Sequence, residues 1–346
     1  MRMKSLHLIG LIAVAAATMH GQTYWTNPAP DCSSLGVPFT QAVPITNSSG
    51  TTIGYSCSVT GTFVWLAAGG TWSTVIRVAA PASNPVGVDY LLYDQSGAAL
   101  SLDTTINNGT VASGGEVTFG LNANQPAELE MLGATSDAGT NYSNTATGSV
   151  YATFYCPDAT TCANVLPQLM YSAQPTYPWF LSVPIAWDNA VSYQWSAEGI
   201  DDGSTSVVSL VIYNEDSQGA AYNVYVYDSS GNLFGQGTTP VIQSGSNTAT
   251  GEAGTYAVVL RDLVSTLPPG IFKILVSGSS LSAVEVLQIT AAPGGTATSP
   301  TAAATTLQVA YDSAPGSASS AAAGIKRWSA KRLRVTPKQM FKPLPK

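Results

Sequence analysis

Carboxylates are the side chains in this sequence whose grouping best suits acid–base chemistry. Glu198, Asp201 and Asp202 lie in the stretch EGIDDG, and Glu215 and Asp216 follow in NED. A glycosidase needs two carboxyl groups about 5–10 Å apart, one as acid and one as base or nucleophile. Asp and Asn also form turns, so the competing interpretation is that these are solvated turn residues. A third interpretation is that Asp201 and Asp202 help backbone carbonyls to hold Ca²⁺.

Histidine occurs only near the N-terminus, as His7 and His20. If a signal peptide is cut after Gly21, the processed chain has no imidazole. This excludes Ser-His-Asp and Cys-His nucleophiles and His-ligated metals. Residues 22–325 also contain no phosphate-binding glycine motif in a strand-to-helix setting. We therefore expect no catalytic residues and no cofactor.

The N-terminal 21 residues have the pattern of a signal peptide. Arg2 and Lys4 precede an apolar run over residues 6–17, which is too short to span a membrane. The alternative is a short membrane anchor. No later segment has the roughly 18 apolar residues of a transmembrane helix. We therefore expect a secreted, cell-surface or periplasmic protein without a transmembrane segment.

Four cysteines agree with export. An even number of cysteines in an exported chain predicts disulfides, and four allow three pairings. We favour Cys32–Cys57, which would staple the N-terminal segment, and Cys156–Cys162, which would close the short loop CPDATTC. The alternative is a zinc site, although the spacing differs from paired C-x-x-C knuckles.

The stretch between residues 171 and 195 is unusually aromatic. Exposed rings stack on sugars, so Tyr177, Trp179, Trp187 and Trp195 are the candidate ligand-binding residues of this chain. Aromatic side chains more often fill a core or seal a contact between domains, and that interpretation is favoured here.

Charge is divided between an acidic body and a basic C-terminus. Residues 22–325 hold all 20 acidic residues and only Arg77, Arg261 and Lys273 as basic ones, a formal charge of −17. Residues 326–346 carry +8. The acidic body disfavours nucleic acid and anionic membrane as partners. The basic tail has three interpretations: an electrostatic hook for an anionic cell surface, a solvated disordered terminus, or a misread end of the gene.

One phrase occurs twice, 134 residues apart, as LLYDQSGAAL at 91–100 and YVYDSSGNLF at 225–234. In each copy an Asp can accept a backbone hydrogen bond, and Gly97 or Gly231 can take the positive φ that a hairpin turn requires. Flanking strand-like runs keep the same offset, STVIRV at 73–78 against VVSLVI at 207–212. The repeat predicts two modules of the size of a β-sandwich, with one hairpin in each.

The elements that must position these residues are short strands. Val, Thr and Tyr are punctuated by Gly, Asn and Pro, and no stretch after the signal shows a helical apolar period. We expect an all-β chain of two tandem Ig-like antiparallel β-sandwich domains with a disordered C-terminal tail. The expected boundaries are a signal peptide at 1–21, a disulfide-bearing segment at 22–59, sandwiches at 60–170 and 171–292, a flexible linker at 293–325 and a basic tail at 326–346.

The stretch AAGGTWSTVIRV followed by YLLYDQSGAAL resembles the G-G-x-W-x-T strand and hairpin of β-sandwich modules in exported bacterial proteins. The stretch from Gly199 to Leu233 resembles a second, diverged copy that lacks the Trp. The resemblance implies a fold and export, and it carries no activity or catalytic residues with it.

These observations give three expectations for function. The first is an exported, non-catalytic structural or adhesion protein of unknown ligand, with a cell-surface or glycan partner. The second is a carbohydrate-binding protein that uses the aromatic residues at 177–195. The third is a carboxylate-dependent glycosidase.

Overall fold

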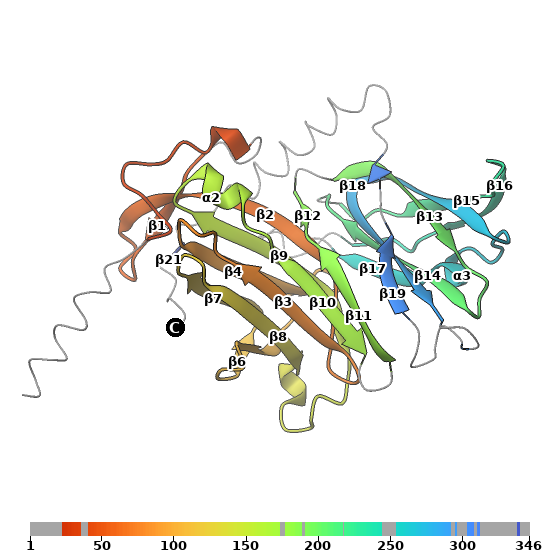
Figure 1. Ribbon diagram of the computed structural model, residues 1–346, viewed down its shortest axis with the longest axis horizontal. Helices are drawn as coiled ribbons and strands as arrows, with labels where there is room; N and C mark the ends of the chain where they lie inside the picture. Colours follow the sequence, from red (N-terminus) through yellow and green to blue (C-terminus); the bar gives the residue numbers. More distant parts are fainter. Residues whose placement is uncertain are drawn as a thin grey trace, which may run out of the picture.

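The structure is a computed structural model that describes residues 23–35, 41–173, 177–188, 191–216, 218–243, 254–291, 295, 303–307, 310–311 and 338–339. The predicted signal peptide, most of the predicted linker and most of the basic tail lie outside these residues. The described chain is built of β-strands with a few single helical turns, so the prediction of an all-β fold is confirmed. Strands β1 to β12 form one body and strands β13 to β20 a second body beside it (Figure 1).

The first sheet runs in the order β21-β1-β2-β9-β4-β7, with β12 paired to β2. Its strands are β1 (Val43–Thr46), β2 (Thr52–Ala68), β4 (Val86–Asp94), β7 (Glu116–Leu121), β9 (Ala146–Cys156), β12 (Ala186–Trp187) and β21 (Lys338–Gln339). All its pairs are antiparallel except β1 with β21, which is parallel.

The second sheet runs in the order β11-β10-β3-β8-β5-β6 and is antiparallel throughout. Its strands are β3 (Ser73–Ala79), β5 (Leu102–Ile106), β6 (Ala112–Gly114), β8 (Pro126–Ala134), β10 (Gln168–Ala173) and β11 (Tyr177–Pro184).

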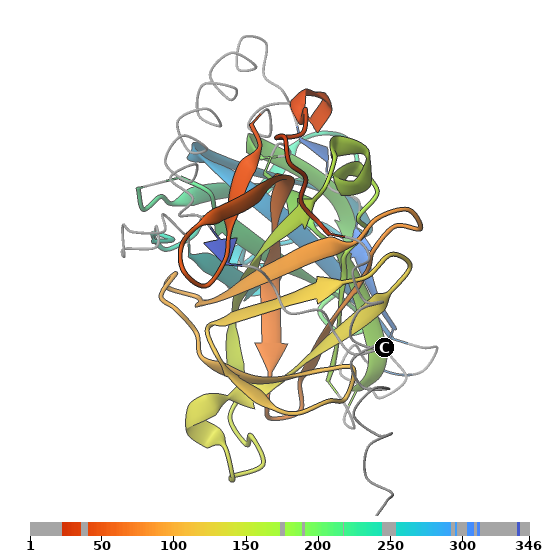
Figure 2. The same ribbon diagram turned by 90° about the vertical axis from the view of Figure 1, so that its left-hand side faces the viewer.

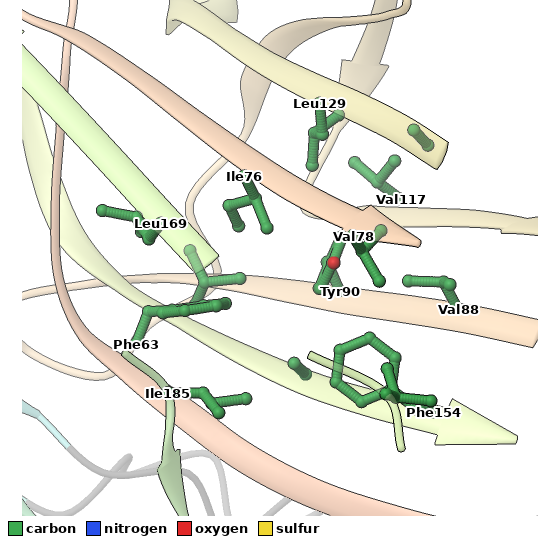
Figure 3. Packing of buried hydrophobic residues seen from close by; sticks show 14 of the residues in the cluster. Phe63, Ile76, Val78, Val88, Tyr90, Val117, Leu129, Phe154, Leu169 and Ile185 are labelled. Atoms are coloured by element: carbon green, nitrogen blue, oxygen red, sulfur yellow. The ribbon is translucent and has the colours of Figure 1, made fainter. Parts of the chain in front are cut away.

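These two sheets stack face to face and enclose the larger core, and we call them the N-terminal sandwich. Alternate residues of each strand point inward, as in Val88, Tyr90 and Leu92 of β4, which are fully buried. Figure 3 shows Tyr90 between Phe154 of the first sheet and Val78 of the second. Two stacked layers that bury alternate apolar positions are the arrangement expected from the composition.

The third sheet forms the second body, and we call it the C-terminal sheet. Its strands are β13 (Ser192–Ile200), β14 (Ser206–Asn214), β15 (Tyr222–Tyr227), β16 (Leu233–Thr238), β17 (Thr255–Val259), β18 (Ile271–Thr290), β19 (Ala303–Leu307) and β20 (Ala310–Tyr311). Strand β18 is long enough to serve two layers: its first half pairs with β13 and β15, and its second half with β14 and β19. A second core, with Trp195 and Tyr222 among its members, lies inside this folded sheet.

Helical structure in the described chain is limited to η1 (Ser33–Leu35), η2 (Thr135–Asp137), α2 (Ala159–Ala163) and α3 (Leu260–Leu263). Asp158 begins α2 because its carboxylate accepts a hydrogen bond from the Thr161 backbone N–H at 2.7 Å. Within the described residues, no helix has the length and apolar character that a membrane crossing requires.

The two repeated phrases form the same turn. Asp94 Oδ1 accepts hydrogen bonds from the Ser96 and Ala98 N–H groups at 2.8 and 3.0 Å. Asp228 Oδ1 accepts equivalent bonds from residues 230 and 232, both at 2.9 Å. The following glycines have φ of 82° and 83°. The strands after the turns differ: β15 pairs with β16 in a hairpin, whereas β4 and β5 join opposite sheets after a single bridge between Tyr93 and Ala99.

The two bodies meet through a small apolar cluster, and Leu287 of β18 also joins the larger core. Val64 of β2 packs against Val211, Tyr213 and Ala283 of the C-terminal sheet. The first repeated turn takes part, because the Thr255 N–H donates to the carbonyl oxygen of Gln95 at 3.1 Å. The Thr255 hydroxyl also donates to the Val64 carbonyl at 2.9 Å. The junction therefore combines apolar packing with hydrogen bonds to backbone groups.

Both predicted disulfides, Cys32–Cys57 and Cys156–Cys162, are present. Cys57 on β2 lies directly opposite Cys156 on β9, so the two bridges meet at one end of the N-terminal sandwich. Figure 2 views the molecule from this side. Among the described residues no cysteine is free.

The strand pairing differs from the expected boundaries at two places. Strand β2 begins inside the segment expected at 22–59, so that segment is part of the first sheet. Strands β10 and β11 pair with each other and with β3, and β12 pairs with β2. The pairing of the N-terminal sandwich thus extends to Trp187, beyond the boundary expected at residue 170.

Candidate functional site

The outer face of the C-terminal sheet carries the candidate site. Along β13, β15 and β18, alternate residues point away from the second core. Lys273 on the central strand β18 lies opposite Glu198 on one side and opposite Tyr227 on the other. The register therefore places an ammonium group, a carboxylate and a phenol in one row across three strands.

A cavity of about 430 Å³ opens at this row. Gln194, Glu198, Tyr227, Lys273 and Leu275 contribute to its lining. The volume is within the range of small-ligand sites, which combine apolar walls with a few converging polar groups.

The second repeated turn forms one edge of the cavity, through Asp228, Ser229 and Gly231. The Asp228 carboxylate is held by this turn, and the hydrogen bonds from the backbone and side chain of Asn232 lower its pKa. Asp228 therefore shapes the edge of the site, and its oxygens are already engaged.

Glu198 and Lys273 are available for a ligand. Both side chains are exposed, and neither forms an ion pair or a hydrogen bond within the part of the chain that the structure describes. A second cavity, of about 380 Å³, differs in this respect. There Arg77 and Glu128 form an ion pair of 3.0 Å with each other. Of these two cavities, the first is the one whose charged side chains have no ion-pair partner among the described residues.

The predicted aromatic residues do not gather into one platform. Trp195 is only 7% exposed, and its indole N–H donates to the Ser282 carbonyl at 3.0 Å inside the second core. Trp187 is half-buried, and its ring lies 6.0 Å from that of Phe154 in an edge-to-face contact. Trp195 therefore has no ring face for a sugar, and Trp187 packs against the first core. Tyr177 and Trp179 lie on β11, and their side chains are outside the described part of the structure.

Asp201 and Asp202, the residues considered for calcium, are engaged by the protein itself. Asp201 is buried and accepts hydrogen bonds from the N–H groups of Gly203 and Val208 and from the Arg261 guanidinium. Asp202 caps the next turn: hydrogen bonds from Thr205, and then from the Ser206 and Ser204 N–H groups, hold its pKa far below the usual range. These contacts occupy the oxygens that a cation would need.

The remaining carboxylates are dispersed. Glu215 is buried at the end of β14, and Asp216 follows it in a turn, whereas Glu198 lies on the outer face of β13. In the described ranges, no group of three or more His, Cys, Asp or Glu side chains is placed to hold a metal ion.

Sequence reasoning found Glu198 but not its neighbours in the row. In the sequence, Tyr227 is visible only as part of the second repeated phrase, and Lys273 only as one of the three basic residues of the body. The sequence feature that could have identified them is the alternation of side chains in NVYVY at 223–227 and IFKIL at 271–275. It puts Tyr227 and Lys273 on the polar face of their strands. That the two strands are neighbours is not visible in either segment.

Comparison of the chain with protein-family models, with curated proteins and with solved structures gives no match.

Proposed function

We propose that the protein is an exported, non-catalytic adhesion protein that contacts its ligand at the Glu198–Lys273 row. The proposal depends most on one observation: these two opposite charges face each other across neighbouring strands, and neither has an ion-pair partner among the described residues. Export is supported by the two disulfides and by the apolar N-terminal run. The same proposal includes two tandem Ig-like units, supported by the two cores and the repeated turn, and a disordered C-terminal tail, supported by its composition.

A saccharide is the ligand class that the row fits best. Tyr227 offers a half-buried ring, and Gln194 and Glu198 offer hydrogen-bonding groups beside it. Sugars are bound by an aromatic ring together with polar side chains around it. This keeps the carbohydrate-binding hypothesis and moves it from the aromatic stretch at 177–195 to the outer face of the C-terminal sheet.

A hydrolytic role has less support. A glycosidase needs two carboxyl groups at a separation of about 5–10 Å, one of them able to carry a proton. Asp228 shares the cavity with Glu198, but its turn lowers its pKa and favours the ionised form. Asp201 is paired with Arg261.

A glycan-array screen of the processed protein tests the proposal, with bound hits re-measured on variants. Tyr227→Ala and Glu198→Gln should each weaken binding about tenfold, which corresponds to about 1.4 kcal/mol. Arg77→Met, in the second cavity, should bind like the wild type. A blank array rejects the saccharide class and leaves a structural role. A hit that is unaffected by Tyr227→Ala and Glu198→Gln rejects this site.

A further inference from the structure

The strands around the two repeated turns are arranged in the same order. In the first sheet the order is β2-β9-β4-β7, and in the C-terminal sheet it is β13-β18-β15-β16. In the opposing layer, β3 lies between β10 and β8, and β14 lies between β18 and β17. Positions of the two bodies can therefore be matched strand by strand, starting from Asp94 and Asp228 in the two turns.

The N-terminal sandwich meets the second body with the outer face of its first sheet. Val64 of β2 is 4% exposed there and lies at the bulge opposite Ser149 of β9, which in turn lies opposite Tyr93 of β4. In the second body the matching strands carry the row described above, Glu198, Lys273 and Tyr227. Val64 and Glu198 keep the 134-residue offset of the repeated phrases. The row is therefore the counterpart of the surface that the N-terminal sandwich uses at the junction.

The C-terminal sheet meets the first body with its other layer. Val211 and Tyr213 of β14 and Ala283 of β18 pack against Val64, and each of the three is at most 2% exposed. Ala257 of β17 lies opposite Val211 and borders this cluster. The junction thus joins the outer face of one layer to the outer face of the opposing layer in the next body.

The N-terminal sandwich has the counterpart of that second surface on its second sheet. Its residues come from β3, from β8 and from just before β10: Arg77, Ala79, Glu128 and Leu166. In that order they match Val211, Tyr213, Ala257 and Ala283. The matches along β3 and β14 keep the 134-residue offset, and the others follow from the pairing of β8 and β10 with β3.

Both counterpart surfaces are exposed, whereas the junction is closed. The cavity of about 430 Å³ lies on the first surface, which we call the row face (Glu198, Tyr227 and Lys273). The cavity of about 380 Å³ lies on the second, which we call the ion-pair face (Arg77, Ala79, Glu128 and Leu166). Strands β15 and β16, beside the row face, lie at the end of the molecule away from the N-terminal sandwich (Figure 1).

Each face also presents apolar surface. Ile271, in the lining of the first cavity, is 57% exposed, and Leu166, in the lining of the second, is 81% exposed. Protein contacts combine such apolar side chains with charged and polar groups around them.

The charges of the two faces are complementary. Within the chain Val64 packs against Val211, so the same placement brings Glu198 to Arg77. Thr255, at the start of β17, donates to the carbonyl oxygens of Val64 on β2 and of Gln95 after β4, so β17 crosses over β9. In the matching placement β8 crosses over β18 and brings Glu128 to Lys273. Arg77 and Glu128 already pair with each other, so the four charges form one alternating network.

One set of junction contacts has no counterpart. Pro126 lies opposite Ala79, as Thr255 lies opposite Tyr213. Proline has neither a backbone N–H nor a hydroxyl group, so the two hydrogen bonds that Thr255 donates at the junction are not repeated. The charge pairs take their place, and they make the contact sensitive to salt.

We propose that the row face of one copy of the protein docks on the ion-pair face of a second copy, in the arrangement that the junction has within one chain. The two faces are different surfaces, so the contact is heterologous and adds copies head to tail. Junctions between domains resemble transient protein contacts, so the association is weak. The inference rests on the proposed function in using the row as a contact surface, and it adds a protein partner there.

Sedimentation equilibrium of the processed full-length protein, loaded from about 1 μM to about 1 mM, tests the proposal. The weight-average mass should rise with concentration beyond that of a dimer, because every added copy leaves a free face at each end. Salt at about 1 M should weaken the association, since it screens the charge pairs.

Two variants each disable one face. Lys273→Glu leaves only negative charges on the row face, and Arg77→Glu leaves only negative charges on the ion-pair face. Both side chains are exposed, so the fold should be retained. Each variant should weaken association at least about tenfold, because like charges then meet. Asp262→Lys, exposed on α3 and outside the lining of both cavities, is the control and should associate like the wild type.

A mixture of the two variants tests the head-to-tail geometry. The ion-pair face of Lys273→Glu and the row face of Arg77→Glu are intact and can dock on each other. The two altered faces repel, so the mixture should form a 1:1 complex and grow no further.

A protein that stays monomeric over the whole concentration range would overturn the proposal. Association that neither variant weakens, or a mixture without a 1:1 complex, would do the same. A blank glycan array together with self-association rejects the saccharide alone, whereas saccharide binding by a strictly monomeric protein rejects the self-association alone.

Discussion

Tyr90 brings a hydroxyl group into the centre of the N-terminal sandwich. Its ring lies 6.0 Å from both Phe119 and Phe154 in edge-to-face contacts. Its hydroxyl oxygen is buried and has no hydrogen-bond partner among the described residues. A buried polar group without a partner loses its bonds to water and gains none in return. The ring of Tyr90 therefore stabilises the folded state, whereas its hydroxyl group destabilises it.

Replacing Tyr90 by Phe should raise the free energy of unfolding by about 1 kcal/mol, because the ring contacts remain and the desolvated hydroxyl is removed. Urea denaturation followed by circular dichroism measures the change. Tyr222→Phe is the matched control. Its single hydroxyl proton is shared between two acceptors, Asn214 Oδ1 at 3.0 Å and the Leu281 carbonyl oxygen at 3.2 Å. That variant should lose about 1 kcal/mol. Equal losses in both variants would contradict the interpretation of Tyr90.

At the scale of an element, strand β9 depends on a close approach to β4. Gly148 lies opposite Asp94, and a Cβ atom at Gly148 would meet the Tyr93 carbonyl oxygen at 1.8 Å. Backbone atoms do not give way as a flexible side chain does. β9 lies between β2 and β4 in the first sheet, so any displacement spreads to both neighbours.

Gly148→Ala should therefore lower the free energy of unfolding by about 3 kcal/mol, as overpacking against backbone does. Gly139→Ala is the control: its φ is +86° and nothing lies within 4 Å of the added carbon. It should cost only the strain of a left-handed residue, about 1 kcal/mol. Thermal or urea unfolding compares the two. A Gly148 variant as stable as the Gly139 variant would show that the strands can separate freely.

The features predicted correctly at this scale are local ones. The repeated turns follow from Asp and Gly at fixed offsets within five residues, and the disulfide Cys156–Cys162 from a sequence separation of 6. The pairing of strands is non-local and was only partly anticipated. The aromatic strand β11 belongs to the N-terminal sandwich because it pairs with β10, and nothing within β11 itself indicates that partner.

The candidate site shows the same limit. Glu198 was recognisable as a carboxylate in a cluster, but its cluster neighbour Asp201 turns inward to meet Arg261. The residues that do lie beside Glu198 come from β15 and β18, and the register of these strands brings Lys273 and Tyr227 together. Spacing along one segment predicts a turn, whereas a site on a sheet face depends on which strands are neighbours.

For the whole molecule, the pKa shifts define how stability varies with pH. Burial raises the pKa values of Tyr90, Tyr155 and Tyr222 above 10 in the folded protein. The folded state then holds these protons more tightly than the unfolded state. Their contribution is fully present below pH 10 and is lost as the pH rises above it. For Asp202 and Asp228, hydrogen bonds lower the pKa, so their contribution is present above about pH 4 and is lost as the pH falls further.

Stability should therefore be level between about pH 5 and pH 9, and above pH 10 it should fall by about 1.4 kcal/mol per pH unit for each buried tyrosine. Urea denaturation at several pH values gives the slope, and absorbance at 295 nm follows tyrosine ionisation. Exposed tyrosines should ionise reversibly, and the buried ones only as the circular dichroism signal is lost. Tyr90→Phe should reduce the alkaline slope. Ionisation of all tyrosines near pH 10 in a folded protein would contradict this.

The position of the four cysteines has a consequence for how the protein is made. Cys57 and Cys156 face each other on neighbouring antiparallel strands, where Cα atoms are about 4.5–5.5 Å apart and within disulfide range. If β2 pairs with β9 while the thiols are still reduced, Cys57 and Cys156 lie side by side, although neither is the other's native disulfide partner. Native bonding then requires Cys32 and Cys162 to arrive early, or an oxidoreductase to exchange the bond afterwards. The order of strand assembly and thiol oxidation would decide the yield of natively bonded protein in any expression host.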